Sequence, residues 1–362
     1  MIDSNIIDKQ WMKRAIYLAS LGRGTTSPNP MVGAVILDKY GNLISEGFHY
    51  KSGMPHAEAM AFGNLKKDAR GGTIYVNLEP CCHHGKTPPC VEKIISSGLK
   101  KIFISIKDPD KRVSGKSIKL LKKSGVEVHL GLCEKESLEI NKSFIHRNIT
   151  GKAYGVLKWA MSIDGRVGLK NGQSKWITNK RSRSLVHSYR SGFDAIIIGG
   201  NTLRKDDPLL TSRGAKIHEP LRVVFTRTLD LPEKSNLWNC KVAKTLVVYD
   251  SSKADEENLK RIPECVEIEK VSSDNPRLIS NLLAKRGCNS VLWECGPNLA
   301  TAAIKSGCVQ ELMTFISPKI LGGEISMNPF ADFGFSNMNE VLNLKSPDIS
   351  LIGNDICVKS PI

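Results

Sequence analysis

The chain has 362 residues, of which 41% are hydrophobic and 24% are charged. This composition is ordinary for a globular protein, and the length predicts about two domains. The net charge of +16 is shared by both halves, because residues 1–150 hold 23 Lys and Arg against 14 Asp and Glu and the remainder holds 29 against 22. We interpret this charge as a solvated basic surface. The even distribution of charge between the two halves excludes a basic arm or tail. If the positive charge has a function, attraction of phosphorylated small substrates is favoured.

The N-terminal residues 1–10 contain Asp3 and Asp8 and no apolar run, so they lack the pattern of a signal peptide. No segment approaches the roughly 18 apolar residues of a transmembrane helix. We therefore expect a cytoplasmic protein with no membrane partner. Scattered cysteines in such a protein are interpreted as small buried hydrophobic residues rather than disulfides. They are Cys133, Cys240, Cys265, Cys288, Cys295, Cys308 and Cys357.

Helical and strand patterns alternate through the first part of the chain. Helical spacing of apolar residues or a proline at a helix start predicts helices, and short apolar runs between turns predict strands. Helices are expected over residues 8–21, from residue 55 onward, and over 88–98, 116–124 and 134–144. Strands are expected over residues 32–37, 43–50, 73–78, 101–106 and 126–130. This alternation predicts an α/β layer structure with helices on both faces of a sheet.

A polar joint at residues 146–152 separates this part from the next, which gives expected domains of residues 1–149 and 150–362. The alternation then restarts. Strands are expected over residues 154–161, 195–199, 221–225, 244–249, 290–294 and 311–316, and helices over 179–189, 276–285 and 297–305.

Residues 78–90 concentrate the soft metal ligands of the chain, namely Cys81, Cys82, His83, His84 and Cys90. They follow the segment His56-Ala57-Glu58 by about twenty residues. Thiolates and imidazoles are the ligands that Zn²⁺ prefers in a tetrahedral site. A histidine, a glutamate two residues later and a following Pro-Cys with a second cysteine form the pattern of zinc-dependent nucleobase deaminases.

Three ligands can converge from neighbouring elements: His56 at a helix start, Cys81 at a strand end and Cys90 at the next helix start. This choice leaves one coordination position for water and makes Glu58 available to move protons. The side chain of Cys82 should point elsewhere, and His83 and His84 would line the pocket. A structural zinc site with four protein ligands is the alternative, but it gives Glu58 no role.

The spacing of the two cysteines departs from the general deaminase pattern, because eight residues rather than two separate Cys81 from Cys90. With this enlarged loop the chain resembles the bifunctional riboflavin-biosynthesis deaminase/reductase family. The family segments T-x-P-N-P-x-V-G, P-H-A-E and E-P-C-x-H-H-G-[KR]-T-P-P-C match residues 26–33, 55–58 and 79–90. The resemblance implies a cytidine-deaminase-like α/β/α domain, with zinc on His56, Cys81 and Cys90 and Glu58 as the catalytic acid and base.

The second half lacks the G-x-G-x-x-G pattern of a Rossmann dinucleotide site. Taken alone, residues 294–299 could cradle a phosphate at a helix start or could be a tight turn. Several segments are similar to the reductase half of the same family, whose fold resembles dihydrofolate reductase; they are residues 157–166, 174–178, 199–202, 206–211 and 293–299.

This resemblance implies NADPH as cofactor and assigns residues to two sets. The nucleotide set is Ala160, Trp176, Thr202, Asp206, Gly296, Pro297, Asn298 and Leu299. The substrate set is Ser174, Arg190, Leu210, Arg213 and Glu294. Arg190 and Arg213 would suit a phosphate, and Lys158 and Asp206 would order the sugar. Arg227, where family members often carry an acidic or hydroxyl residue, could meet the 2′-phosphate of NADPH.

The implied function is zinc-dependent hydrolytic deamination of 2,5-diamino-6-(5-phosphoribosylamino)pyrimidin-4-one. NADPH reduction of the ribosyl group to ribityl would follow. The implied partners are small phosphorylated pyrimidines and further copies of the chain, with no nucleic acid. Asn29, His83, His84 and Lys86 could position the base or the phosphate. A tRNA or single-strand DNA deaminase with an accessory domain is the alternative. It would suit the positive charge, but it normally shows the short Cys-x-x-Cys spacing and leaves more than half of the chain unexplained.

Overall fold

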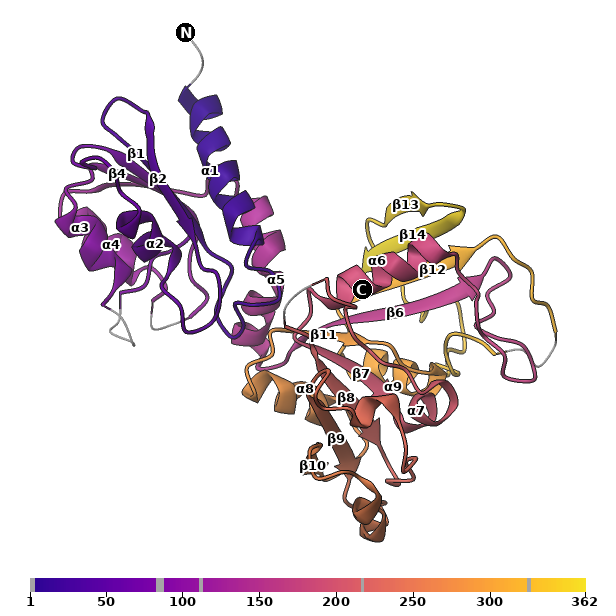
Figure 1. Cartoon of the computed structure of the whole chain (residues 1–362). Coiled ribbons are helices and arrows are strands. Elements are labelled where there is room, and N and C mark those ends of the chain that lie inside the picture. Colours follow the sequence, from indigo (N-terminus) through magenta and orange to yellow (C-terminus); the bar gives the residue numbers. More distant parts are fainter. Residues whose placement is uncertain (1–3, 83–87, 111–112, 216–217, 324–326) are drawn as a thin grey trace. The chain divides into compact units, whose positions relative to one another are not determined.

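The computed structural model describes residues 4–82, 88–110, 113–215, 218–323 and 327–362 (Figure 1). The chain divides into two compact units, Met1–Thr150 and Gly151–Ile362. Within the described ranges, no helix is both long enough and apolar enough to cross a membrane.

The first unit is built on a five-stranded sheet with the order β2-β1-β3-β4-β5. Strand β1 pairs antiparallel with β2 and β3, whereas β3, β4 and β5 run parallel. All five residues of β1 are buried, as expected for a strand that is covered on both faces. The strands are β1 (Gly33–Leu37), β2 (Leu43–Phe48), β3 (Thr73–Leu78), β4 (Lys101–Ile106) and β5 (Glu127–Leu130).

Helices cover both faces of this sheet and make three layers (Figure 1). On one face, α1 (Ser4–Ser20) and α5 (Glu134–Thr150) pack against β1, β3 and β4. The other face is covered by α2 (Ala57–Gly63), α3 (Cys90–Ser96) and α4 (Lys116–Lys123).

The predicted end of the last helix of this unit was wrong. We expected it to stop at residue 144 and a polar joint to follow, but α5 continues to Thr150. Side chains sustain the extra turns, since Asn148 donates to the Phe144 carbonyl at 2.9 Å and Thr150 to the His146 carbonyl at 2.8 Å. Arg147 also donates to the Pro28 carbonyl at 2.9 Å. Two side-chain bonds within the helix and one tertiary contact therefore accompany the extra turns of this polar sequence, whose helix propensity is low.

The second unit contains a nine-stranded sheet with the order β10-β9-β8-β7-β11-β6-β12-β14-β13. The strands from β10 to β12 are parallel, and β14 and β13 continue the sheet antiparallel. They are β6 (Tyr154–Ser162), β7 (Ala195–Gly199), β8 (Leu221–Thr226), β9 (Thr245–Asp250), β10 (Glu267–Val271), β11 (Ser290–Trp293), β12 (Glu311–Ser317), β13 (Asp348–Ile352) and β14 (Asp355–Pro361).

Helices again lie on both faces of the sheet. Cores form between the sheet and α6 (Lys180–Arg190) and α7 (Gly200–Asp206) on one side, and α8 (Pro276–Lys285) and α9 (Pro297–Lys305) on the other. Two short 3₁₀ helices, η1 (Asn236–Trp238) and η2 (Glu256–Arg261), lie in the connections around β9.

Four elements of this unit escaped prediction: β10, β13, β14 and α7. Strand β10 alternates half-buried and exposed residues at a sheet edge, and every residue of β13 except the last is exposed, so neither forms an apolar run. Two glycines, Gly199 and Gly200, gave no helical signal, but the helix begins at Gly200 and inserts Leu203 into the core.

A close contact between α1 and β1 at Gly33 gives a test of this packing. A Cβ at Gly33 would lie 2.1 Å from the Ala15 carbonyl oxygen, so Gly33→Ala must push the helix away from the sheet. We expect a loss of about 1–3 kcal/mol in the free energy of unfolding, measured by urea denaturation. Gly63→Ala is the matched control, because a Cβ there meets no described atom within 4 Å. Equal effects of the two substitutions would contradict the packing.

Candidate functional site

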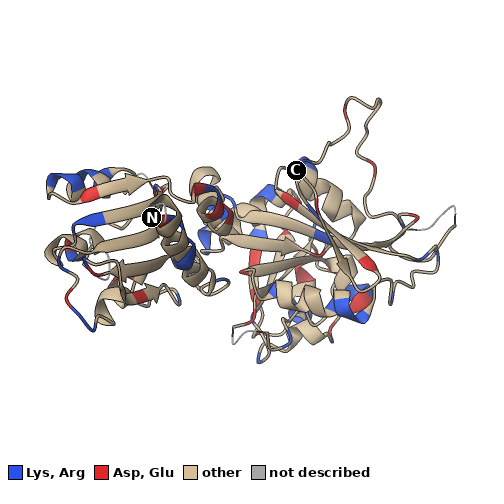
Figure 2. Ribbon diagram, turned by 90° about the horizontal axis from the view of Figure 1, so that it is seen from above, with Lys and Arg blue, Asp and Glu red and all other residues tan. Residues whose placement is uncertain are grey.

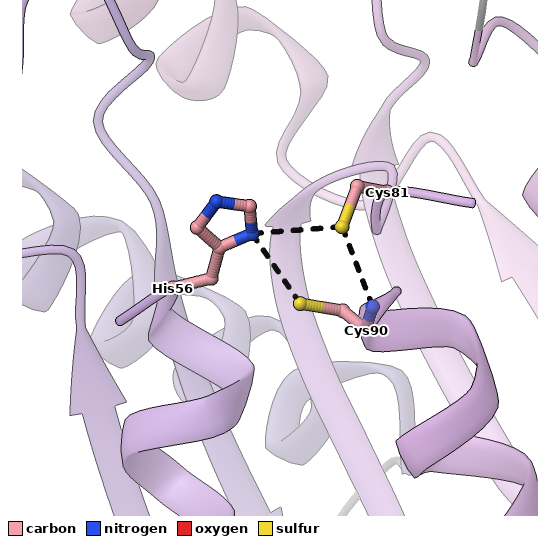
Figure 3. Close-up of side chains that lie close together, drawn as sticks. All are labelled: His56, Cys81 and Cys90. Carbon is pink, nitrogen blue, oxygen red and sulfur yellow. Dashed lines mark hydrogen bonds between the residues drawn. The ribbon is translucent and has the colours of Figure 1, made fainter. Parts of the chain in front are cut away.

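Three elements of the first unit bring the predicted zinc ligands together (Figure 3). His56 is the N-cap residue of α2 and has an extended backbone, one position before the first turn in which it was expected. Cys81 follows the end of β3, and Cys90 is the first residue of α3, directly after Pro89. The ligand atoms of all three residues lie within 4.8 Å of one another.

The distances within this group fit a tetrahedral metal. His56 Nδ1 lies 3.5 Å from Cys81 Sγ and 3.4 Å from Cys90 Sγ. Ligands of a tetrahedral zinc, with Zn–S near 2.3 Å and Zn–N near 2.0–2.1 Å, would be separated by about 3.5 Å. The backbone N–H of Cys90 donates to Cys81 Sγ at 3.3 Å, a contact that stabilises negative charge on this sulfur. The donor set and its spacing therefore suit Zn²⁺.

The three groups of this site hold their protons unequally. The hydrogen bond with Cys90 lowers the pKa of the Cys81 thiol to about 4, and the same bond raises the pKa of Cys90. The hydrogen bond with Cys81 raises the pKa of His56. Because metal ligands must be deprotonated, binding of a metal here releases protons.

Glu58 lies in the first turn of α2, beside the three ligands but outside their group. Its side chain is 3% exposed. Burial raises the pKa of this carboxyl, and the negative charge of Cys81 raises it further. A buried carboxyl next to a metal site is placed to accept and return protons.

Sequence reasoning missed His49, a buried residue that supports His56. The two imidazole rings meet edge to face with centroids 5.7 Å apart. His49 Nδ1 lies 3.0 Å from the Pro55 carbonyl, which can only accept, so Nδ1 carries the hydrogen and Nε2 accepts from Asn29 Nδ2 at 3.1 Å. Burial lowers the pKa of His49 and favours this neutral form. A lone histidine after a strand carried no signal of this role.

The structure describes only some of the other residues in the segment 78–90. Cys82 packs against the hydrophobic core of the first unit, so the prediction that it points elsewhere is confirmed. His83, His84 and Lys86 lie outside the described residues.

A cavity of about 680 Å³ opens in the second unit where β7, β8 and β11 end. In open parallel sheets, the carboxyl ends of the strands are where ligands bind. The lining includes part of the predicted nucleotide set, namely Thr202 and Gly296, Pro297, Asn298 and Leu299, together with Arg227. Gly200 also lines the cavity, and a Cβ there would approach Thr226 Oγ1 to 3.1 Å.

The other predicted nucleotide residues are not among the described residues that line this cavity. Trp176 is 61% exposed, and the Arg183 guanidinium lies 4.5 Å from its ring centroid. Lys175 Nζ donates to the Asp206 carbonyl at 3.3 Å, which brings the segments of Trp176 and Asp206 together. Ala160 pairs with Phe315 inside the sheet.

Two members of the predicted substrate set form a buried ion pair. Arg190 Nε and Nη2 donate to the two carboxylate oxygens of Glu294 at 2.7 and 3.1 Å. Lys158 Nζ lies 3.8 Å from the same carboxylate. Burial alone would raise the pKa of Glu294, but Arg190 and Lys158 outweigh it and lower the pKa to about 2. Glu294 is therefore ionised, and two N–H donors of Arg190 are used to bind it.

The rest of the substrate set lies around this pair. Arg190 Nη1 donates to the Thr211 carbonyl at 3.2 Å, next to the buried Leu210. The turn is left-handed at Leu210 and Arg213, with φ of 52° and 54°. Such backbone conformations are costly for side chains other than glycine and often occur in ligand-binding turns. Ser174 is half-buried and Arg213 is exposed.

Removal of the Arg190 guanidinium tests this ion pair. In Arg190→Met the Glu294 carboxylate stays buried beside Lys158 alone, so we expect a loss of about 3–5 kcal/mol in unfolding free energy at pH 7. The folded-state pKa of Glu294 rises in this variant, so the deficit relative to wild type should shrink as pH falls toward 4.

The double variant Arg190→Met/Glu294→Gln is the control, because it removes both charges and should recover part of the loss. Denaturation curves across this pH range measure all three proteins. A deficit that is independent of pH, and equal in the single and double variants, would contradict the ion pair.

Comparison with known proteins covers nearly the whole chain. The family model described as cytidine and deoxycytidylate deaminase zinc-binding region matches residues 6–106. The model described as RibD C-terminal domain matches residues 153–358. The chain is 41% identical to the riboflavin biosynthesis protein RibD of Synechocystis, over 97% of this chain and 95% of that protein. It is 36% identical to the RibD protein of Aquifex aeolicus, over 97% and 98%.

Solved structures agree with these matches. A diaminohydroxyphosphoribosylaminopyrimidine deaminase/5-amino-6-(5-phosphoribosylamino)uracil reductase from Thermotoga maritima is 34% identical, with a TM-score of 0.89 over 99% of each chain. RibD from Acinetobacter baumannii is also 34% identical, with a TM-score of 0.88 over 99% of this chain and 100% of that one.

The expected fold class is thereby confirmed, with a cytidine-deaminase-like α/β/α domain followed by a reductase domain of the dihydrofolate-reductase type. The expected cofactors, Zn²⁺ and NADPH, are those of the two matched domains. The chain belongs to the RibD family of bifunctional deaminase/reductase enzymes of riboflavin biosynthesis.

Proposed function

We propose that the first unit deaminates 2,5-diamino-6-(5-phosphoribosylamino)pyrimidin-4-one to 5-amino-6-(5-phosphoribosylamino)uracil. The second unit then uses NADPH to reduce the ribosyl group of this product to ribityl. The observation that carries the proposal is the convergence of His56, Cys81 and Cys90 next to the buried Glu58, in a chain that matches deaminase/reductase relatives from end to end.

In the first unit, His56, Cys81 and Cys90 would hold Zn²⁺, which acidifies the attacking water when it is bound. Glu58 accepts the proton of this water and delivers protons to the ring nitrogen and to the departing ammonia. His49 supports His56 in two ways: the two imidazole rings meet edge to face, and His49 Nδ1 hydrogen-bonds to the carbonyl of the preceding residue, Pro55. Asn29, which is hydrogen-bonded to His49, is suited to position the pyrimidine base.

In the second unit, the cavity at the ends of β7, β8 and β11 would hold the nucleotide of NADPH, which supplies the hydride. Thr202 and residues 296–299, where α9 starts, line this cavity and would hold the nucleotide. We assign Ala160, Trp176 and Asp206, which lie outside the lining of that cavity, to the remainder of the cofactor.

The substrate of the reductase step would lie beside Glu294. Arg190 is already bound to this carboxylate through two donors, so Arg190 chiefly holds Glu294 in place. Arg213, which is exposed, is the better candidate to grip the phosphate. Ser174 and Leu210 complete the substrate side, and Lys158 joins Asp206 in ordering the sugar.

We propose small phosphorylated pyrimidines rather than nucleic acid as partners. Figure 2 shows Lys and Arg distributed over both units, and helices that carry basic residues without acidic ones, such as α4 and α6, occur in each unit. We also propose a homo-oligomer. Strand β13 is a sheet edge with Ile349 and Leu351 64% and 75% exposed, and such an edge favours pairing with a second copy.

Substitution of Glu58 tests the deaminase proposal. Glu58→Gln keeps the size of the side chain but removes its ability to accept a proton, so deamination should fall by about 10³-fold. Zinc content and NADPH-dependent reduction of the deaminated substrate should stay at wild-type levels. Cys90→Ser is the comparison variant, because it should lower both zinc content and deamination. Full deaminase activity in Glu58→Gln would overturn the assignment.

Substitution of Arg227 tests how the cavity recognises the cofactor. Its side chain is 66% exposed at the end of β8, 3.9 Å from the Asp274 carboxylate, and it lines the cavity. If Arg227 meets the 2′-phosphate, Arg227→Ala should raise the KM for NADPH by about tenfold, because one charge-assisted contact is lost. The KM for NADH should stay unchanged, because NADH has no 2′-phosphate.

The matched control is Arg261→Ala, which removes the same charge from an exposed position outside the lining of the cavity. Parallel changes for both nucleotides in Arg227→Ala, or an equal effect in Arg261→Ala, would reject the contact.

A further inference from the structure

Two cysteines of the second unit, Cys240 and Cys265, lie beside each other although 24 residues separate them. Cys240 follows η1, and Cys265 lies between η2 and β10. The backbone N–H of Cys240 and the thiol of Cys265 donate to one acceptor, the Trp238 carbonyl, at 3.0 and 3.5 Å. The neighbouring Cys265 thiol also raises the pKa of Cys240. The shared acceptor therefore places the Cys265 sulfur next to Cys240.

The loop that carries Cys240 is held in place by a buried cation. Arg222 is 0% exposed, and its Nη2 donates to the carbonyls of Leu237, Asn239 and Ala243 at 2.8, 3.0 and 2.7 Å. Thr245 Oγ1 adds a bond of 2.7 Å to the Leu237 carbonyl. The backbone on both sides of Cys240 is thus held in place, which lowers the entropy cost of bringing the two thiols together.

Charge and exposure give the two thiols different roles. The Arg222 guanidinium interacts favourably with negative charge on either sulfur. Cys265 is exposed, whereas Cys240 is half-buried. Burial and the neighbouring Cys265 thiol raise the pKa of Cys240 to about 11, against the opposing effect of Arg222. An oxidant from solution would therefore meet Cys265 first.

Other cysteines of this unit lack this setting. Cys288, Cys308 and Cys357 are buried, and burial raises the pKa of the Cys308 thiol to about 11. Burial also strongly raises the pKa of Cys295. These residues fit the expectation of small hydrophobic packing residues. Cys240 and Cys265 do not.

We propose that Cys240 and Cys265 are a reversible disulfide pair, which joins the loop after η1 to the segment that enters β10. Strand β10 is the edge of the nine-stranded sheet and pairs only with β9 among the described strands. A covalent bond at Cys265 therefore fixes the least supported strand of the parallel part of the sheet. This assignment is independent of the reactions proposed above.

The chemistry needs a small disulfide, such as oxidised glutathione, as the oxidant. The Cys265 thiolate attacks one glutathione sulfur, forms a mixed disulfide and expels the other glutathione as a thiolate. The Cys240 thiolate then attacks the Cys265 sulfur, forms the Cys240–Cys265 bond and expels the second glutathione. Two electrons pass from the protein thiols to the oxidant, and the two thiol protons are taken up by the released glutathione thiolates.

The test uses the full-length, zinc-loaded protein incubated with oxidised glutathione, alkylated and digested with trypsin without reduction. Cleavage after Lys234, Lys241, Arg261 and Lys270 releases residues 235–241 and 262–270. We expect these two peptides to be linked, with a mass lower than their sum by two hydrogens, and reduced glutathione to separate them. Hydrogen exchange across residues 245–271 should slow in the oxidised protein.

Two variants separate the roles of the thiols. In Cys240→Ser, glutathione should accumulate on Cys265 because the resolving thiol is gone. In Cys265→Ser, Cys240 should stay unmodified, and neither variant should show the slower exchange. Cys133→Ser, in the first unit, should behave as wild type. A stable glutathione adduct on Cys265 of the wild type, unlinked peptides at full oxidation, or linkage without slower exchange would each overturn the proposal.

Discussion

The edge of the first sheet where β3 ends imposes the main constraint on this protein. Two thiolates and one imidazole must meet within the reach of a single metal ion, and each comes from the end of a different element. The N–S distances of 3.4 and 3.5 Å require β3 and the starts of α2 and α3 to be fixed relative to one another. The three-layer packing supplies this rigidity. The close approach of α1 to Gly33 and the buried residues of β1 hold the sheet, and the sheet holds the ligands.

The second unit meets a different requirement, which is to keep charges ionised inside a folded domain. Glu294 remains a carboxylate because Arg190 and Lys158 surround it. Arg222 is buried completely, and its Nη2 donates to three backbone carbonyls at short distance. In both cases the cost of burying a charge is offset by several directed hydrogen bonds or ion pairs. The first cluster belongs to the proposed substrate site, and the second organises the loop that carries Cys240.

All three residues of the metal group could be predicted from the sequence, because they lie at element ends that turn and proline signals reveal. His56, Cys81 and Cys90 needed only the positions of one strand and two helix starts. The pairing of Arg190 with Glu294 could not be predicted in the same way, since it joins side chains 104 residues apart. His49 carried no pattern at all. The scattered cysteines were predicted to be packing residues, and Cys240 and Cys265 depart from that expectation only because a fold brings them together. The polar end of α5 was misjudged because side-chain hydrogen bonds and a tertiary contact, rather than propensity, accompany its last turns.

The coupling of the two reactions can be measured by incubation of the full chain with the diaminopyrimidinone phosphate, with and without NADPH. We expect ammonia release at the same rate in both samples. We also expect oxidation of one NADPH for each ammonia, beginning only as the deaminated product accumulates. Oxidation of NADPH without prior ammonia release would contradict the proposed order of the two reactions. Ammonia release that is never followed by oxidation would contradict the role of the second unit.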